Sequence, residues 1–417
     1  MKKFLKDEVK FMTVLSGVRV LDLTHYIAGP YCSQILADYG ADVIKIERLD
    51  GEVGRTSAPM HDDISLYFAS ENRNKRGLSL DLKSSKGKAI LHRLIETSDV
   101  LVTNYGSNVP EKLGFSYETI SAINPEISMV HITGFGTTGP YRDYGAYDGV
   151  IQSMSGLAEL TGHPDGPPTY VGFFIADHIA GLQATLGTML ALFHKERTGK
   201  GRFVDISMLD GLVSLLGFSI SEAKLHGITK QRWGTSDRFQ YSKAFPTIDG
   251  YVFLGAYINA PEKKWIEFAK LIGKNEWAQS NSPFFMEEGR FKNREILDKT
   301  IAEWTIQHTK EEAFQFLQQK GIASSPVNNL DEVINNPQIQ HREMIKSLNI
   351  GNLNVPVPGV AIKITENIKE FTIPPTLGEH SKEILAQLGF SDDEIEDFIV
   401  NNIVRVDTYD NCIVNKI

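Results

Sequence analysis

The chain has 417 residues, of which 41% are hydrophobic and 23% are charged, so it can bury enough apolar surface to fold and is not a disordered chain. Its length predicts two or three domains. A formal net charge of −9 argues against a dedicated nucleic-acid-binding protein, and two cysteines indicate neither a disulfide framework nor a cysteine-based metal site.

Residues 1–14 mix lysines and acidic residues with a few apolar ones and lack the uninterrupted apolar stretch of a signal peptide. We interpret them as a leader outside the fold. No window of the sequence is long and apolar enough to predict a transmembrane span. The cytoplasm is therefore the expected compartment, and no membrane partner is expected.

A β-α-β unit opens the predicted fold. Residues 18–23 form a short β-branched and aliphatic run that is typical of a buried strand. After the loop 24–29, Pro30 suits the first turn of a helix, which Gly40 can end in a left-handed cap. Residues 42–47 then predict a second strand, parallel to the first.

The same alternation of strands and helices continues along the chain. Helices predicted over 84–97 and 117–123 precede strands predicted over 100–102 and 128–132. This order predicts an α/β fold with a doubly wound parallel sheet. Such a sheet binds its ligands at the carboxyl ends of the strands.

The stretch 177–195 predicts a long helix, because its apolar side chains recur at helical spacing. Strand-like alternation follows over 203–208. One face of the helix carries small residues, which allow close packing: Ala180, Gly181, Ala184 and Gly187.

The domain organisation is predicted from a change of sequence texture near residue 241. We expect the N-terminal part of a large α/β domain at 15–216 and a smaller α+β domain at 241–329. The segments 217–240 and 330–372 are predicted as linkers. Residues 373–417 are predicted as a C-terminal part that returns to the large domain.

Known nucleotide and metal motifs are missing from the sequence. The first strand-loop-helix turn lacks G-x-G-x-x-G, so Glu47 is better explained as a carboxylate paired with Arg48 than as a ribose ligand. The histidines are scattered without metal-ligand spacing, and we predict no metal site. Basic residues that follow predicted strands favour a phosphate-bearing ligand over plain solvated surface: Arg48, Lys75, Arg76, Lys83 and Lys112.

Asp177 lies where the apolar run 173–176 meets the predicted helix. One interpretation is an N-cap, a position that aspartate favours because its side chain accepts hydrogen bonds from free backbone N–H groups. The other is a nucleophile, since a helix N-terminus would keep the carboxylate ionised. Spacing alone favours the N-cap.

Five segments stand out along the chain: GVRVLDLTHYIAGPYCSQILADYGADVIKIER, NKRGLSLDLKSSKGK, ITGFGTTGPY, FFIADHIAGLQATLGTMLALFHKERTGKGRFVDISMLD and PPTLGEHSKEIL. Together and in this order they resemble the family III CoA-transferases, which include formyl-CoA transferase and the carnitine and bile-acid CoA-transferases. The resemblance covers nearly everything from about Leu15 to Val400.

The resemblance implies a mechanism and a set of site residues. Asp177 matches a nucleophilic aspartate, which attacks an acyl-CoA thioester, forms a mixed anhydride and then carries CoA as an aspartyl thioester. Acyl-CoA and a carboxylic acid are the implied partners of a CoA-binding large domain, and no tightly bound cofactor is expected. The residues that match CoA-contacting positions are Tyr26 and Ala28 through their backbone, Arg48, Leu80, Lys83, Asn104, Tyr105 and Lys112.

Three features of the sequence bear on the substrate. Ile27 stands in place of a glutamine of formyl-CoA transferase and implies a more apolar acceptor pocket. Tyr147 and Asp148 match a Tyr-Glu pair beside the nucleophile. The segment Tyr257-Ile258-Asn259 stands roughly where that enzyme has a glycine-rich loop. Ile27 and the absence of that glycine-rich loop argue against an oxalate/formate substrate pair.

Two other functions stay open on this resemblance. The related α-methylacyl-CoA racemases carry a histidine in a G-H-D motif, where this chain reads Gly145-Ala146-Tyr147-Asp148, so one of two acid-base groups is missing. A catalytically silent CoA-binding protein is the second alternative, and the retained Asp177 argues against it. The resemblance also implies a homodimer whose two chains interlock.

Overall fold

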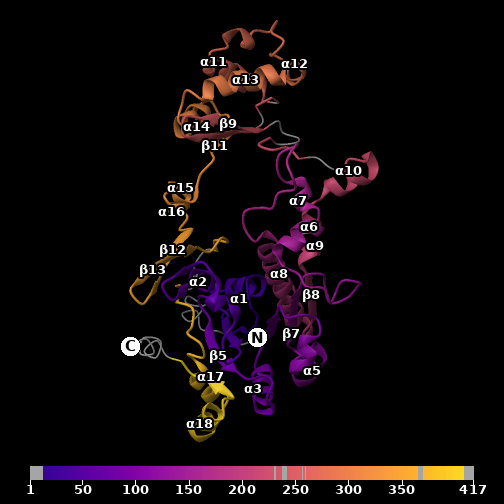
Figure 1. Cartoon of the computed structure of the whole chain (residues 1–417), viewed down its shortest axis with the longest axis vertical. Coiled ribbons are helices and arrows are strands. Elements are labelled where there is room, and N and C mark those ends of the chain that lie inside the picture. The colour runs from indigo at the N-terminus through magenta and orange to yellow at the C-terminus, as the bar shows by residue number, and fades with distance from the viewer. Residues whose placement is uncertain are drawn as a thin grey trace. The chain divides into compact units, whose positions relative to one another are not determined.

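The computed structural model of the protein describes residues 13–229, 232–236, 242–255, 257–258, 260–364 and 370–407 (Figure 1). The chain divides into two compact units. The first unit contains the chain up to Leu157, residues 170–227 and the chain from His341 onward. The second unit contains residues 158–169 and 228–340.

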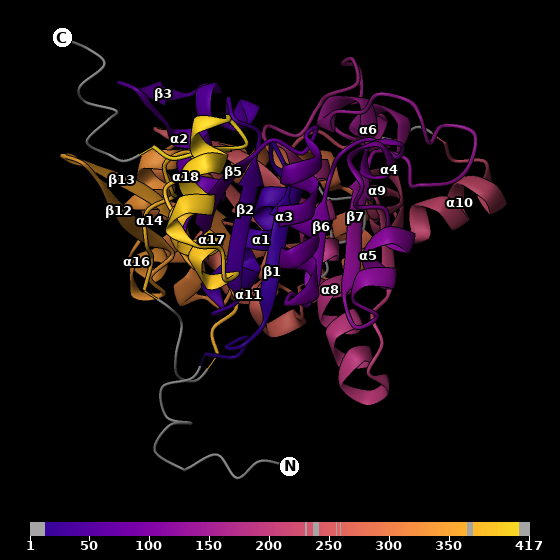
Figure 2. The same ribbon diagram turned by 90° about the horizontal axis from the view of Figure 1, so that it is seen from below.

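A seven-stranded sheet forms the centre of the first unit (Figure 2). All neighbouring strands run parallel except β14, which pairs antiparallel with β5. This arrangement confirms the predicted mixed α/β fold with a large, mostly parallel sheet. From edge to edge the strands are β14 (Val404–Arg405), β5 (Arg76–Leu80), β2 (Asp42–Glu47), β1 (Arg19–Leu23), β6 (Val100–Thr103), β7 (Ser128–Thr133) and β8 (Phe203–Ser207).

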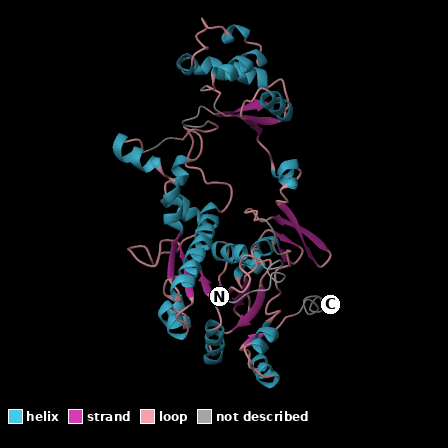
Figure 3. Ribbon diagram, turned by 180° about the vertical axis from the view of Figure 1, so that it is seen from behind, coloured by secondary structure: helices cyan, strands magenta, loops and turns pink. Residues whose placement is uncertain are grey.

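The first unit also contains helices and two small hairpins (Figure 3). The hairpins are β3 (Met60–His61) with β4 (Ile64–Ser65), and β12 (Ile345–Ile350) with β13 (Leu353–Pro358). The helices are α1 (Ala28–Asp38), the 3-10 turn η2 (Val53–Thr56), α2 (Leu66–Glu71), α3 (Ser85–Glu96), α4 (Val109–Leu113), α5 (Tyr117–Ile123), α6 (Asp148–Met154), α8 (Ile175–Thr198), α9 (Met208–Leu215), α10 (Phe218–His226), α17 (Ser381–Gln387) and α18 (Asp392–Val400).

The strand order reverses at β1. The chain adds β2 and β5 on one side of β1 and then crosses over to add β6, β7 and β8 on the other side. Leu23 of β1 pairs with Thr103 of β6, so the two strands end at the same level. In a parallel sheet this reversal opens a crevice beyond the carboxyl ends of the two strands.

The sheet has an apolar core on each face, because successive side chains of a strand point to opposite faces. Val20 and Val43 pack in one core with residues of α1, α8 and α9. Leu21 and Ile44 pack in the other core with residues of α3, α5, α17 and α18. The C-terminal helices α17 and α18 therefore cover the same face as α3.

Helices α1 and α8 pack closely because small residues face the contact. Ala180, Gly181, Ala184 and Gly187 of α8 are all buried, as the sequence predicts, although Gly187 faces Val204 of β8 and not α1. A Cβ atom at Gly181 would lie 2.8 Å from the carbonyl oxygen of Ala28, so no larger residue fits there without movement. This close approach brings the first turns of the two helices together.

The second unit has its own sheet and core. Strands β9 (Lys243–Thr247), β10 (Gly250–Leu254) and β11 (Ser324–Pro326) form an antiparallel sheet in the order β11-β10-β9. Trp265 and Phe268 are fully buried in the core beside it. The helices are most of α7 (Leu157–Leu160), α11 (Glu262–Leu271), the 3-10 turn η3 (Asn275–Ala278), α12 (Glu287–Lys292), α13 (Arg294–Thr305), α14 (Lys310–Gln319), α15 (Leu330–Ile334) and most of α16 (Pro337–His341).

The units differ from the expected domain boundaries at three places. Residues 217–240, expected as a linker, contain α10, which buries no side chain and so lacks the apolar stripe by which a helix is recognised. Residues 330–372, also expected as a linker, contain α15, α16 and the β12–β13 hairpin. Residues 158–169, expected in the large domain, belong to the second unit.

The expected leader, 1–14, lies outside the described residues except for Thr13 and Val14. The hydroxyl groups of Thr13 and Ser16 form a hydrogen bond of 2.7 Å, so Thr13 is already part of the folded chain. In the described ranges, no helix combines the length and the apolar character that crossing a bilayer requires.

Candidate active site

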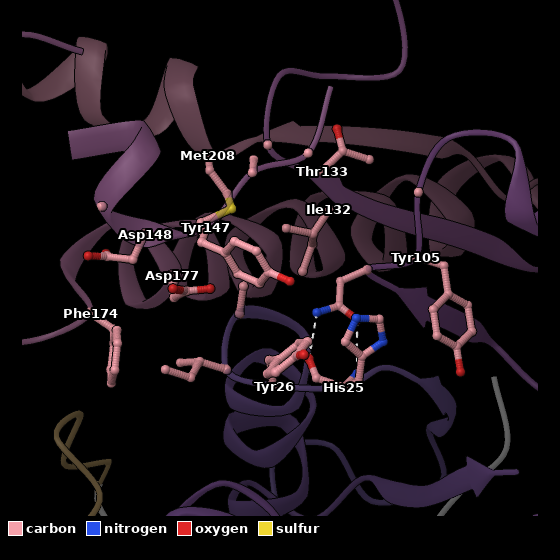
Figure 4. A pocket seen from close by; sticks show the side chains of 18 of the residues that line it. His25, Tyr26, Tyr105, Ile132, Thr133, Tyr147, Asp148, Phe174, Asp177 and Met208 are labelled. Carbon is pink, nitrogen blue, oxygen red and sulfur yellow. Dashed lines mark hydrogen bonds between the residues drawn. The ribbon is translucent and has the colours of Figure 1, made fainter. Parts of the chain in front are cut away.

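A cavity of about 580 Å³ lies at the carboxyl ends of β1, β6 and β7 (Figure 4). Three segments that end or follow these strands line it: 25–28, 104–107 and 132–134. The start of α6 contributes Asp148, and the first turn of α8 contributes Asp177. The cavity thus occupies the crevice that the reversal of strand order creates.

Asn104 holds the loop that follows β1. Its side-chain amide donates to the carbonyl oxygen of His25 at 2.6 Å and accepts from the backbone N–H of His25 at 2.9 Å. The next residue, Tyr26, has a left-handed backbone with φ of 61°, which is unfavourable for a residue with a Cβ atom. The N–H of Tyr26 donates to Glu52 at 3.3 Å, so hydrogen bonds on both sides hold this strained loop.

Buried charges are attached to the same loop. Asp22 pairs with Lys75 at 2.9 Å, and both side chains are fully buried. Lys45 donates to the carbonyl oxygen of Thr24 at 3.2 Å and lies 3.4 Å from Glu52. Burial alone would raise the pKa of Asp22, but the charges of Lys75 and Lys45 outweigh it and hold that pKa below its usual range. Lys75, expected among the phosphate-binding cations, is therefore not available to a ligand.

Asp177 is the third residue of α8. The N-cap of this helix is Phe174, which makes no side-chain capping hydrogen bond. The interpretation of Asp177 as an N-cap is therefore wrong, because the helix begins two residues earlier than predicted. Asp148, which belongs to α6, instead accepts a hydrogen bond from the backbone N–H of Ala176 at 2.7 Å.

The surroundings of Asp177 make it a weak acid. Burial, followed by the negative charge of Asp148, raises the pKa of Asp177 to about 7. His178 and the backbone N–H of Ala28 act in the opposite direction. Burial and the charge of Asp148 therefore act against the expected effect of the helix N-terminus, which was to keep this carboxylate ionised. A carboxyl group that titrates near pH 7 in a cavity is typical of a functional site.

The predicted site residues fall into two groups. Arg48, Lys83 and Lys112 are exposed and do not line this cavity. Leu80 is 1% exposed, and its side chain packs in the core instead of facing a ligand. The predicted residues that do line the cavity are Tyr26, Ile27, Ala28, Asn104, Tyr105, Tyr147, Asp148 and Asp177.

Two further expectations about charged residues are corrected by the ion pairs. Glu47 pairs with Arg55 at 2.7 Å and not with Arg48, which pairs with Asp50 at 2.9 Å. Arg76, expected near a phosphate, pairs with Asp42 at 2.7 Å. Both corrections arise because the partners come together only when strands and turns pack.

Several lining residues escape prediction from the sequence. Tyr67 comes from α2. Burial, followed by the negative charge of Asp177, raises the pKa of Tyr67. Its hydroxyl group therefore keeps a proton that it can donate. Arg142 comes from the loop between β7 and α6. No motif points to either residue. Thr133, by contrast, directly follows the predicted strand 128–132. A position at the carboxyl end of a parallel strand indicates a residue that lines the ligand site, so Thr133 could have been predicted.

Other expectations concern the small domain and metal ions. Tyr257 and Ile258 are buried in the core of the second unit, and Asn259 lies outside the described residues. Across the part of the chain that the structure describes, no three histidine, cysteine, aspartate or glutamate side chains gather to hold a metal ion.

The sequence and the fold both have known counterparts. Residues 15–381 match the model of CoA-transferase family III. The chain is 34% identical over 415 residues to a formyl-CoA:oxalate CoA-transferase of Rhodopseudomonas palustris (strain BisA53), with 91% of this chain and 95% of the relative covered. It is 34% identical over 398 residues to a succinyl-CoA:mesaconate CoA-transferase of Haloarcula hispanica, with 91% and 97% covered. The crystal structure of a CAIB/BAIF family protein from Brucella suis matches with a TM-score of 0.82 and 30% identity, covering 90% of this chain and 100% of that one.

The chain belongs to CoA-transferase family III. This match confirms the resemblance that the five sequence segments carry. The relatives are named CoA-transferases, which confirms the predicted enzyme class.

Proposed function

We propose that the protein transfers CoA from an acyl-CoA donor to a free carboxylic acid, with Asp177 as the nucleophile. The observation that carries this proposal is the position of Asp177, a carboxyl group with a pKa of about 7 that lines a cavity at the switch point of the sheet. Membership of the family supports the reaction class.

The proposed reaction consists of four acyl transfers. The Asp177 carboxylate attacks the thioester carbonyl of the donor, and CoA leaves as a thiolate while a mixed anhydride forms. The thiolate attacks the aspartyl carbonyl, which releases the donor acid and leaves an aspartyl-CoA thioester. The acceptor carboxylate then attacks this thioester, expels the CoA thiolate again and forms a second mixed anhydride with Asp177. The thiolate attacks the acceptor acyl carbonyl of this anhydride, which gives the new acyl-CoA and frees Asp177. Each step replaces one activated acyl bond by another, so no outside energy source is needed.

Neighbouring groups suit the needs of this chemistry. The backbone N–H of Ala28 and the hydroxyl of Tyr67 both interact electrostatically with Asp177, and such donors stabilise negative charge that develops on reacting oxygens. The anhydride must also be protected from water. Apolar side chains of Ile27, Phe174 and Met208 line the cavity and serve that purpose.

We place the nucleotide end of CoA outside the cavity, toward Arg48, Lys83 and Lys112. Arg48 follows β2, Lys83 follows β5, and Lys112 lies on α4 after β6, so all three come after strands of the same sheet. The resemblance matches these positions to CoA contacts, and all three side chains are exposed at the surface, where Arg48 makes only an exposed ion pair with Asp50.

Reversing the charge at Arg48 tests this placement. Arg48→Glu is expected to raise the KM for acyl-CoA about 5- to 10-fold and to leave the KM for the free acid nearly unchanged, because one phosphate contact is lost. The effect should shrink as salt rises, since exposed charges are screened. Steady-state kinetics with each substrate varied separately measure it, with Lys346→Glu as an exposed control of equal charge change. A rise in the free-acid KM alone would contradict the placement.

The acceptor is proposed to be more apolar than oxalate. Ile27 presents an aliphatic side chain among the lining residues where the resemblance matches a glutamine. The relatives named for succinyl-CoA and mesaconate show that the family accepts larger acids than formate and oxalate. A mass-spectrometric screen of carboxylic acids against several acyl-CoA donors would identify the pair.

We also propose that the enzyme is a homodimer of interlocked chains in the cytoplasm. The support for a dimer is a large apolar surface on α8, since such surfaces mark sites of association. The apolar side chains that form this surface of α8 are between 45% and 63% exposed: Leu182, Leu186, Leu190 and Phe193.

Covalent trapping tests the proposed function. Enzyme incubated with acyl-CoA and then with hydroxylamine should carry a hydroxamate at Asp177, because only a thioester or anhydride carbon is electrophilic enough to react. Peptide mapping by mass spectrometry locates the label, and Asp148, the neighbouring carboxylate, serves as internal control and should stay unmodified. A label elsewhere with Asp177 untouched would exclude the mechanism. Deuterium uptake next to the thioester carbonyl without CoA exchange would favour a racemase instead.

A further inference from the structure

Asp148 contacts the backbone at the start of α8. It is the first residue of α6 and is 8% exposed. One carboxylate oxygen accepts from the backbone N–H of Ala176 at 2.7 Å, and the other accepts from the side-chain amide of Gln152 at 2.5 Å. Both oxygens therefore act as acceptors, which is what an ionised carboxylate offers.

Gln152 extends this contact to the segment that precedes α8. Its side-chain oxygen accepts from the backbone N–H of Val171 at 2.9 Å, and the side chain is buried. Helix α6 thus holds the segment 171–176 at two points through one chain of hydrogen bonds. Because Phe174 provides no capping side chain, Asp148 supplies the acceptor that an N-cap residue would otherwise supply.

We infer that Asp148 is a positioning residue for Asp177: through its hydrogen bond to the backbone N–H of Ala176 it fixes the first turn of α8, which carries Asp177. The inference rests on the proposed role of Asp177 as nucleophile. It assigns a task to the shorter acid that stands where the resemblance predicts a glutamate.

Other groups face the nucleophile from the elements packed around it. Burial is the largest cause of its raised pKa, Asp148 from α6 is the next, and Glu71 from α2 acts in the same direction. His178 on α8 and the N–H of Ala28 on α1 oppose them, and Tyr67 from α2 is a neutral hydroxyl neighbour. A more basic carboxylate attacks a thioester carbonyl more readily, so the charge of Asp148 strengthens the nucleophile once it is ionised.

Asp148→Asn separates the charge from the shape of this side chain. The substituted amide is nearly isosteric and neutral, and its oxygen can still accept from Ala176, but its NH2 group then faces the side-chain NH2 of Gln152 and that hydrogen bond is lost. The acid limb of the kcat/KM profile should move to lower pH by about one unit, because a like charge beside the nucleophile is removed. At about pH 8.5, where the nucleophile is ionised in both proteins, kcat should still fall about 10-fold. Initial rates across the pH range measure both effects.

Asp148→Ala removes the charge and the cap together. We expect kcat to fall about 100-fold with little change in the KM for acyl-CoA, because a small displacement of a reacting group costs about that much. Asp148→Glu restores the charge and should recover the wild-type acid limb. Met154→Ala is the matched control, since Met154 lies on the same helix, is 48% exposed and does not line the cavity, and it should behave as wild type.

Two results would overturn the inference. The first is an acid limb of the kcat/KM profile that does not move in Asp148→Asn. The second is a raised KM for the free acid with an intact kcat in Asp148→Ala, because that result would make Asp148 a substrate-binding residue. Circular dichroism melts identify variants that fail to fold, and the near-isosteric Asp148→Asn keeps the test decisive if the alanine variant does. A failure of the proposed function is distinguishable, because wild-type enzyme would then carry no hydroxamate at Asp177.

Discussion

Asp177→Asn is expected to abolish CoA transfer and at the same time to stabilise the protein at alkaline pH. An amide is a poor nucleophile, so kcat should fall by about 10⁴-fold or more. The stability gain follows from the pKa of Asp177, which is about 7 in the folded protein against an ordinary value of 3.8. The folded protein therefore binds this proton more tightly than the unfolded chain does. The resulting destabilisation is absent below about pH 4, grows as the pH rises and is complete above about pH 7.

Removing the carboxylate removes this penalty. The variant should be more stable than wild type by about 2 kcal/mol at about pH 8, and nearly equal to it at about pH 4, after allowance for the partial exposure of the side chain. Urea unfolding at the two pH values measures the difference. Asp393→Asn, which changes an exposed carboxylate on α18, is the control and should change neither activity nor stability. Retained activity, or a stability difference that does not depend on pH, would contradict the expectation.

Lys75→Met is expected to destabilise the protein by about 3–5 kcal/mol, because it leaves the buried charge of Asp22 without its partner. The Nζ atom of Lys75 also donates to the carbonyl oxygens of Pro30 and Glu71 at 3.0 Å and to the side chain of Asn72 at 2.9 Å. Methionine fills a similar volume but satisfies none of these acceptors. The loop that carries Tyr26 should lose order as well, so activity is expected to fall with stability.

An exposed ion pair provides the matched control for this prediction. Lys86 pairs with Asp397 at 2.6 Å, but the two side chains are 52% and 50% exposed. Lys86→Met should therefore cost less than about 1 kcal/mol. The free energies of unfolding from urea titrations of both variants give the comparison. Equal losses of unfolding free energy in the two variants would show that burial of the Asp22–Lys75 pair does not increase its contribution to stability.

Local pattern was sufficient for the strands in the middle of the sheet. The strands predicted over 42–47 and 128–132 each contain three apolar residues, and the structure confirms them as Asp42–Glu47 and Ser128–Thr133. Strand β5 was missed. Arg76 and Ser79 interrupt its apolar pattern, and its second neighbour, β14, lies at the far end of the chain. A strand whose polar groups are satisfied by distant partners leaves little local signal.

The same distinction holds for the candidate site. The resemblance places Asp177 at the nucleophile position without any geometry. Its raised pKa depends first on burial and next on Asp148, which is distant along the chain but close in the fold. The two amide contacts of Asn104 with His25 likewise join two loops of different strands. Ion pairs and hydrogen bonds between distant segments were the part that no local pattern could reveal, and Lys75 shows how a cation expected at the surface becomes buried.

The pairing of β14 with β5 has a consequence for co-translational folding. Val404 pairs with Leu80, more than 300 residues earlier, and α17 and α18 complete the core on that face of the sheet. At a translation rate of about 5–20 residues per second, the apolar face around Leu80 stays uncovered for on the order of 15–65 seconds, until α17, α18 and β14 have been synthesised. Nascent chains should therefore be clients of a ribosome-associated chaperone until translation nears its end.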